Sequence, residues 1–343
     1  MENRLTGHVI GINFSYTLEV SSGFQKEKST MSPSAISTND AWALCAWADT
    51  LYVKTNPFKP PPPPSPPPPP WNAVFVPVPP TIQNSNMAAI VQDSGNLQQY
   101  ALVIQGTTNI WDALLDFGID DPSGSPLVPV QGAEIAQGAS TGLSNVLSLT
   151  NTNGQTLQQY LQDPSLIDWS TSYLFLAGHS LGGTLASLLA PWAAVNLFNQ
   201  QQPVEQLPAA IKAITFAAYA AGNQQLADFL DSNQPHRYHA NFNKNDVVPH
   251  VWATAGYYSV HKMYRLFPLP GPSPMPSDLE CEVKKKTATI PPGFNYVQTN
   301  GKSFTVPSKP TESWVDELSY QHNNAYAIEF GTGDSSAPSA DAA

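Results

Sequence analysis

The chain has few charged residues, and this scarcity excludes some classes of function. Only 12% of its 343 residues are Asp, Glu, Lys or Arg, and the formal net charge is −11. A nucleic-acid-binding surface needs a stripe of Lys and Arg that displaces counterions, and the one basic cluster, residues 284–286, is too short. We therefore expect no nucleic-acid partner. Any transient contact with a lipid surface would have to be apolar, since the net charge disfavours docking to anionic lipid.

Cysteine is also scarce. Cys45 and Cys281 are the only two, which is too few for a disulfide scaffold, and the sequence does not show whether they pair. No Cys and His residues have the spacing of metal ligands. We expect neither a metal nor a cofactor.

Long apolar runs are rare as well. The first eight residues contain no continuous apolar segment, so we expect no ordinary signal peptide and place the protein in the cytoplasm or on a signal-less secretion route. Residues 174–198 carry no charge and are long enough to span a bilayer. A Gly-rich break in the middle of this stretch, and Pro191 after it, favour a buried strand followed by a buried helix instead of a transmembrane segment.

Proline, in contrast, is abundant. Residues 60–70 are prolines interrupted only by Ser65, and they predict a polyproline II rod. Such a rod is either a ligand for a proline-binding domain or a stiff spacer, and the absence of a flanking specificity pattern favours the spacer. A helix is predicted over residues 38–54. We interpret residues 1–85 as an N-terminal arm, residues 86–330 as the catalytic domain and residues 331–343 as a disordered tail.

From about residue 86, strands alternate with helices, which is typical of a mostly parallel sheet covered by helices on both faces. The expected strands are 88–91, 100–104, 173–177, 213–217 and 237–242. Helices are expected near 131–149 and 154–162, and from Ser180 to about residue 200. Residues 267–312 break this pattern and are too long for an ordinary connection, so they are interpreted as an insertion or flap.

The most specific motif lies where the third of these strands ends. An apolar run over 173–177 is followed by Gly-His-Ser-Leu-Gly-Gly and then by a small-residue helix. This G-x-S-x-G context exposes a nucleophilic serine on a tight turn, and the helix N-terminus behind Ser180 favours a developing oxyanion. Ser180 is the predicted nucleophile, with the backbone N–H of Leu181 as an oxyanion donor. The alternative is a Gly-rich turn between core elements.

A serine nucleophile needs a base to take its proton and an acid to orient that base. Among the carboxylates after Ser180, Asp246 alone directly follows a predicted strand, which places it at the same sheet edge as the serine. The histidines after Asp246 are His250, His261 and His322. His322 is the preferred base, because the other two lie too close to Asp246 in the chain for a separate loop to return over the serine.

His239, on a predicted strand, is interpreted as a packed residue, and His179 as a structural neighbour of the serine. A second oxyanion donor is expected from Thr107, which follows a strand and a glycine and offers both an N–H and a hydroxyl.

Together these segments resemble the class 3 lipases, the fungal-lipase-like branch of the α/β-hydrolases. Residues 178–183 look like the family's nucleophile elbow, and 105–107 are similar to its Arg-Gly-Ser/Thr oxyanion turn. Residues 215–223 resemble its Thr-Phe-Gly-Ala-Pro-Arg-Val-Gly-Asn strand, and 245–249 match its acid motif. In two departures, Gln105 stands where the family has Arg, and Ala217 to Tyr219 stand where it has Gly-Ala-Pro. The resemblance covers about residues 86–330 and implies an α/β-hydrolase fold, with Ser180, Asp246 and His322 as the triad and Thr107 and Leu181 as the oxyanion hole.

A lid follows the oxyanion turn in this family. The matching stretch here is 109–117, where Trp111, Leu114 and Leu115 could share one helical face. This face is either an amphipathic flap that opens on lipid or an ordinary core-packed helix.

The combined reading is a serine carboxylic ester hydrolase of lipid degradation, with triacylglycerol as the preferred substrate class. Alternatives within enzymes are phospholipase A1 and feruloyl or short-chain esterase activity. Two alternatives belong to other classes of protein. The chain could be a secreted lipase-type effector, with residues 1–85 for delivery, or an inactive binding protein with a hydrolase fold. Acyl-chain length, head-group preference, interfacial activation and oligomeric state depend on pocket shape and are not encoded in these patterns.

Overall fold

The computed structural model describes residues 36–51, 65–78, 86–107, 118–250, 252–253, 277–307 and 313–331. The side chains of residues 278–280 are outside this description. Several expectations fall outside it too. These are the structure of residues 1–35, the first half of the polyproline run, His261, the candidate lid residues Trp111, Leu114 and Leu115, and the expected disordered tail beyond residue 331.

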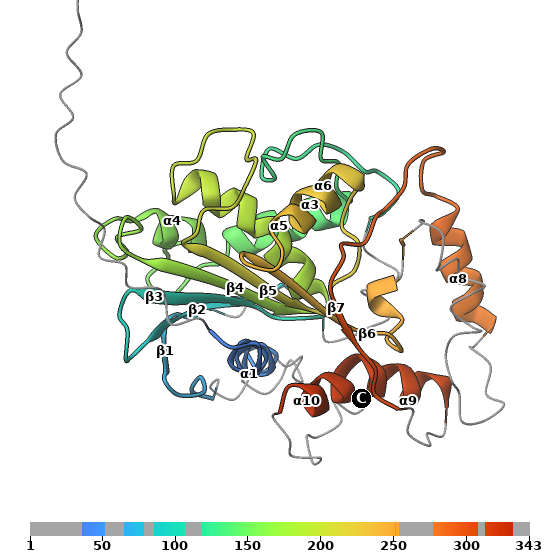
Figure 1. Ribbon diagram of the computed structural model, residues 1–343, viewed down its shortest axis with the longest axis horizontal. Coiled ribbons are helices and arrows are strands. Elements are labelled where there is room, and N and C mark those ends of the chain that lie inside the picture. The colour runs from blue at the N-terminus through green and yellow to red at the C-terminus, as the bar shows by residue number, and fades with distance from the viewer. Residues whose placement is uncertain are drawn as a thin grey trace, which may run out of the picture. The chain divides into compact units, whose positions relative to one another are not determined.

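A seven-stranded sheet with the strands in chain order forms the centre of the protein (Figure 1). β2 is antiparallel to both of its neighbours, β1 and β3, and β3 to β7 are parallel. The strands are β1 (Trp71–Phe75), β2 (Ala88–Asp93), β3 (Gln99–Ile104), β4 (Tyr173–His179), β5 (Ile211–Phe216), β6 (Tyr238–Asn243) and β7 (Lys302–Phe304). The five strands predicted from sequence are confirmed, and the sheet is mostly parallel as expected.

The helices connect and cover these strands. They are α1 (Thr38–Ala48), α3 (Gln137–Leu147), α4 (Leu157–Gln162), α5 (Leu181–Asn196), α6 (Gln224–Ser232), α8 (Ser277–Thr287), α9 (Trp314–Ser319) and α10 (Ala325–Glu329). A 3-10 turn, η1 (Val248–His250), follows β6, and a π-helical turn, η2 (Tyr320–Asn324), joins α9 to α10. The four helices predicted from sequence are present, with shorter bounds than expected.

Both faces of the sheet are buried, and the side chains of each strand alternate between two cores. In β3, Leu102 and Ile104 belong to the core beneath α3 and α5, whereas Ala101 and Val103 belong to the core beneath α1 and α10. This period of two is the expected geometry of a strand. Figure 1 shows α3, α5 and α6 on one side of the sheet, with α1 and α10 on the other.

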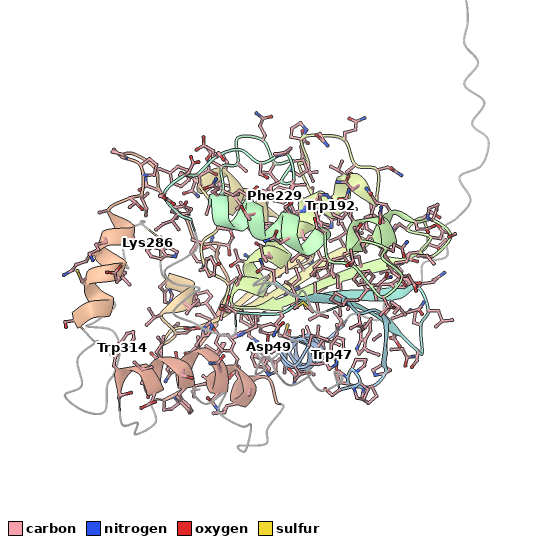
Figure 2. The ribbon with its side chains drawn as sticks, turned by 180° about the vertical axis from the view of Figure 1, so that it is seen from behind. Trp47, Asp49, Trp192, Phe229, Lys286 and Trp314 are labelled. Carbon is pink, nitrogen blue, oxygen red and sulfur yellow. The ribbon has the colours of Figure 1, made fainter. Side chains whose placement is uncertain are left out.

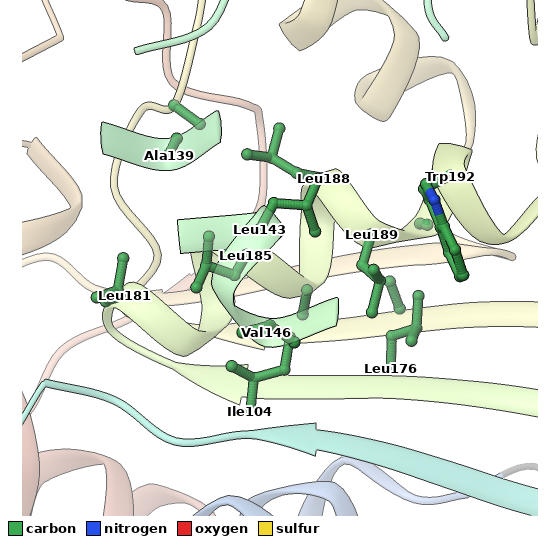
Figure 3. Close-up of a cluster of buried hydrophobic side chains, with 14 of the residues drawn as sticks. Ile104, Ala139, Leu143, Val146, Leu176, Leu181, Leu185, Leu188, Leu189 and Trp192 are labelled. Atoms are coloured by element: carbon green, nitrogen blue, oxygen red, sulfur yellow. The ribbon is translucent and has the colours of Figure 1, made fainter. Parts of the chain in front are cut away.

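The helix α5 lies at the centre of the larger core. Residues 181–194 are all buried, and the leucines of α5 pack on α3 and on the sheet, as Figure 3 shows for Leu185 and Leu189. A helix that is apolar all round belongs inside a protein. Among the described residues, no helix has both the length and the apolarity that crossing a bilayer requires.

The described part of the expected N-terminal arm is built into the sheet unit. Residues 36–343 form one compact unit, in which β1 is the edge strand and α1 packs directly against β3, β4 and β5. Ser37 caps α1 by accepting a hydrogen bond from the Asp40 N–H.

The described part of the expected insertion, residues 277–307, contributes α8 and the short strand β7. β7 extends the sheet beside β6.

Candidate active site

The turn between β4 and α5 holds Ser180 in an unusual backbone conformation. Its φ of 56° and ψ of −126° lie outside the common regions for a residue with a side chain. The Ser180 N–H donates to the Phe216 carbonyl at 2.9 Å, and the residue is 3% exposed. Strain of this kind persists only where the surroundings hold it, and it is characteristic of functional sites.

The turn also requires the two glycines of the motif. A Cβ on Gly182 would overlap the Ile104 carbonyl and lie 2.8 Å from the Gln105 oxygen. A Cβ on Gly178 would overlap the backbone of Gly182 and approach the Gly183 N–H group to 2.6 Å. The main chains of β3, β4 and α5 therefore meet at van der Waals distance behind Ser180.

Asp246 and His322, 76 residues apart, form a buried pair. His322 Nδ1 lies 2.9 Å from Asp246 Oδ2, and both side chains are shielded from solvent. When Nδ1–H donates to the carboxylate, Nε2 becomes the acceptor nitrogen of the neutral ring. This arrangement equips His322 to accept a proton from a hydroxyl group.

His179 connects this pair to the serine. Its Nε2 lies 2.8 Å from the His322 carbonyl oxygen, and the two imidazole rings are 4.6 Å apart. Burial holds the pKa of His179 well below its ordinary value, and the charge of His322 lowers this pKa further. The neutral ring therefore donates to the backbone of His322, so that the residue next to Ser180 helps to hold His322 in place. Among the described residues, the Ser180 hydroxyl makes no hydrogen bond, and the His322 ring is bonded to Asp246. In enzymes, the hydrogen bond between a nucleophile and its base often tightens only in the substrate complex.

His322 lies in the π-helical turn η2, and buried amides hold this turn against β6. Asn243 Nδ2 donates to the Gln321 carbonyl at 3.1 Å and to Gln321 Oε1 at 2.5 Å. Gln321 Nε2 in turn donates to Glu317 Oε1 at 2.8 Å. A π-helical turn widens a helix locally and is frequent at functional sites. No pattern in the sequence indicates this network, because its residues come from separate elements.

Three donors surround the Asp246 carboxylate. Besides His322, the Tyr326 hydroxyl donates to Oδ2 at 3.0 Å, and the Val248 N–H donates to Oδ1 at 3.0 Å. The Tyr326 oxygen also accepts the Asn243 N–H at 3.0 Å. Tyr326 therefore links β6, the acid and α10, a role that the sequence did not reveal.

Replacing Tyr326 with Phe should remove one donor from Asp246 and leave the buried Asn243 N–H without its acceptor. We expect a loss of about 1–3 kcal/mol in the free energy of unfolding, and a drop in kcat of about 3–10-fold. Chemical denaturation and ester hydrolysis measure these effects. Tyr160→Phe is the matched control, because the Tyr160 ring packs on Phe75 in another part of the core. Equal effects of the two substitutions would contradict the role of Tyr326.

The expected oxyanion turn lies beside the elbow, because Ile104 of β3 pairs in register with Gly178 of β4. Thr107 follows this turn, and its Oγ1 is buried with no hydrogen-bond partner among the described residues. Leu181 is the first residue of α5, where backbone N–H groups have no partner within the helix. Unsatisfied donors near a nucleophile are what a developing oxyanion needs.

The other histidines have different surroundings. His250 packs edge-on against Phe242, with ring centroids 5.7 Å apart, and burial lowers its pKa to about 4. The half-buried His239 on β6 also has its pKa lowered to about 4, first by desolvation and then by Lys212 and His236. Within the described residues, His322 is the histidine that the structure brings to Asp246 through a hydrogen bond.

No group of three or more His, Cys, Asp or Glu residues in the described part of the chain could hold a metal ion. Cys45 is buried and Cys281 is exposed, and both are free thiols.

Residues 101–255 match the family model described as Lipase (class 3). This region, which is less than half of the chain, is similar to the class 3 lipases. The match includes residues 105–107, Ser180 and Asp246 and ends before His322. Ala217, which stands where the family has Gly, keeps the left-handed backbone of a glycine, with φ of 51°.

Among curated proteins, the chain is 34% identical over 94 residues to Lipase ZK262.3 of Caenorhabditis elegans. That stretch is 27% of this chain and 24% of the relative, so the chain spans about a quarter of the relative's length. Among solved structures, it resembles M37 lipase with a TM-score of 0.62 and 24% identity, over 76% of this chain and 78% of that one. A triacylglycerol lipase from Penicillium expansum matches at a TM-score of 0.43 and 19% identity, over 64% and 73% of the two chains. The likeness to M37 lipase shows the α/β-hydrolase fold.

Proposed function

We propose that this class 3 lipase-type chain hydrolyses carboxylic esters, with triacylglycerols as its substrate class. The observation that carries the proposal is the buried His322–Asp246 pair held against the residue that precedes Ser180. Ser180, His322 and Asp246 lie on three separate elements, and we assign to them the roles of nucleophile, base and acid that acyl transfer requires.

In this mechanism the Ser180 oxygen attacks the ester carbonyl while His322 Nε2 takes its proton. Asp246 holds the imidazolium through Nδ1, and the N–H groups of Thr107 and Leu181, with the Thr107 hydroxyl, stabilise the oxyanion. His322 then protonates the departing alcohol and leaves an acyl ester on Ser180. Water, deprotonated by His322, hydrolyses this ester and restores the enzyme.

The family match supports a lipid substrate, and the low charge of the chain supports an apolar contact with it. The catalytic groups themselves act on any carboxylic ester. The acyl-chain preference is therefore the property that separates a lipase from a short-chain or feruloyl esterase.

The test is hydrolysis of p-nitrophenyl esters from C4 to C16 by the wild type and by Ser180→Ala. We expect Ser180-dependent turnover that rises toward long chains, followed by hydrolysis of triolein emulsions in preference to phosphatidylcholine vesicles. Turnover confined to short chains would replace the lipase assignment by an esterase, and preference for the vesicles would replace it by a phospholipase. No Ser180-dependent turnover on any ester would overturn the proposal.

A further inference from the structure

The last turn of α1 reaches the oxyanion turn, although the two segments are more than fifty residues apart in the chain. Asp49 caps the C-terminus of α1, and its Oδ1 accepts the Gly106 N–H at 3.0 Å. The backbone carbonyl of the same residue accepts the Gln105 side-chain amide at 3.1 Å. Asp49 thus contacts both residues that precede Thr107. Figure 2 shows Asp49 at the end of α1, beneath the sheet.

Gly106 is enclosed between Asp49 and the elbow. A Cβ on Gly106 would lie 3.6 Å from Asp49 Oδ1, 3.6 Å from His179 Nδ1 and 3.1 Å from the His179 carbonyl. The Asp49 carboxylate and His179, the residue before Ser180, therefore both lie close to Gly106. A shift of Asp49 would remove one of the contacts that hold this turn.

The helix that carries Asp49 is itself packed on the catalytic residues. The Trp42 ring stacks on Tyr326 at 5.7 Å and meets His179 edge-on at 5.4 Å. Both partners contact the His322–Asp246 pair. The end of α1 is therefore fixed relative to the acid, the base and the elbow together.

Asp49 occupies this position at an electrostatic cost. Desolvation raises the pKa of Asp49 to about 6, and the Gly106 N–H and the charge of His322 offset part of the rise. Asp49 also raises the pKa of the buried Cys45 thiol, after desolvation as the main cause. A carboxylate kept where its ionisation is disfavoured, and bonded to a turn beside a nucleophile, points to a functional role.

We propose that Asp49 is a positioning residue for the oxyanion hole. By anchoring Gln105 and Gly106 through these two hydrogen bonds, it sets the direction of the Thr107 N–H and hydroxyl toward the oxygen of the reacting ester. This inference rests on the proposed ester hydrolysis, and it makes the N-terminal helix part of the catalytic machinery. Its effect falls on the transition state, because the oxyanion forms only there.

The test compares Asp49→Ala and Asp49→Asn with Asp40→Asn, which removes an exposed carboxylate at the other end of the same helix. Asp49→Ala should lower kcat for p-nitrophenyl esters about 10–100-fold and leave KM within about 2-fold, since a displaced oxyanion donor affects the transition state more than substrate binding. Asp49→Asn retains an acceptor for the Gly106 N–H and should recover kcat to within about 3-fold. The inhibition constant of an alkylboronic acid, which forms a tetrahedral adduct on serine, should weaken in parallel with kcat.

Thermal stability supplies a second readout. The pKa of Asp49 is higher in the folded protein than the ordinary value of 3.8, so its contribution to stability is present below about pH 4 and is lost as the pH rises through about 6. At pH 8, Asp49→Asn should therefore raise Tm by about 2–4 °C while keeping activity, and this gain should vanish near pH 4. If Asp49 had only a structural role, both Asp49→Ala and Asp49→Asn would have a lower Tm than the wild type.

The outcomes separate the two proposals. If the wild type shows Ser180-dependent turnover and Asp49→Ala has an unchanged kcat, the role of Asp49 is overturned and the proposed ester hydrolysis stands. An equal loss of kcat in Asp49→Ala and Asp49→Asn leads to the same conclusion. Absence of Ser180-dependent turnover in the wild type overturns both. If Asp49→Ala does not fold, Gln105→Ala removes the second anchor and should lower kcat about 3–10-fold at unchanged KM, and an unchanged kcat there overturns the proposal.

Discussion

Asp246→Asn is expected to lower kcat for ester hydrolysis by about 10⁴-fold, a smaller loss than that expected for Ser180→Ala. All three neighbours of the carboxylate are donors, namely the His322 ring, the Tyr326 hydroxyl and the Val248 N–H. An asparagine has one acceptor oxygen, so its NH₂ group must face at least one of these donors. If it faces Nδ1, His322 is driven to the tautomer whose proton lies on Nε2, which cannot accept the proton of Ser180.

Steady-state kinetics at pH 8 measure this loss, and circular dichroism shows whether the variant is folded. Asp228→Asn is the matched control, since Asp228 is an exposed carboxylate on α6 that accepts a hydrogen bond from Gln224. The double variant Ser180→Ala with Asp246→Asn should be no slower than Ser180→Ala alone, because triad residues act as one unit. An Asp246→Asn enzyme with a tenth or more of wild-type kcat would remove Asp246 from the triad.

Gly182→Ala is expected to prevent stable folding, although glycine to alanine is ordinarily favourable within a helix. Gly182 lies in the first turn of α5, and its added Cβ would overlap the Ile104 carbonyl and stand 2.8 Å from the Gln105 oxygen. Both obstacles are main chain at the end of β3, so no side-chain rotation can relieve them. We expect a loss of more than about 3 kcal/mol in the free energy of unfolding, with low soluble yield.

Gly124→Ala is the control for this substitution. Gly124 is exposed, and the nearest atom to its added Cβ is the Ala133 carbonyl at 3.8 Å, an ordinary contact. Thermal melts should place this variant within about 0.5 kcal/mol of the wild type. A Gly182→Ala protein with an unchanged Tm would show that the three main chains do not meet closely at the elbow.

Much of the fold was predictable because its signals are local. The strands β2 to β6 are short apolar runs, and the glycines around Ser180 are required by a turn whose partners lie within a few residues. β7 was missed because it is only three residues long and is recognisable only from its pairing with β6. β1 was missed because it follows the proline run, and only its ladder with β2 identifies it as a strand.

The sequence by itself determined the alternating α/β pattern, the elbow with Ser180 and the placement of Asp246 after β6, because each depends on residues adjacent in the chain. Only the tertiary structure decided that His322 lies against Asp246, that Tyr326 shares the same carboxylate oxygen and that Asp49 reaches the oxyanion turn. These contacts join residues separated by 76, 80 and 57 positions. No periodicity encodes them, since they arise only when α1, the sheet edge and the α9–α10 segment pack together.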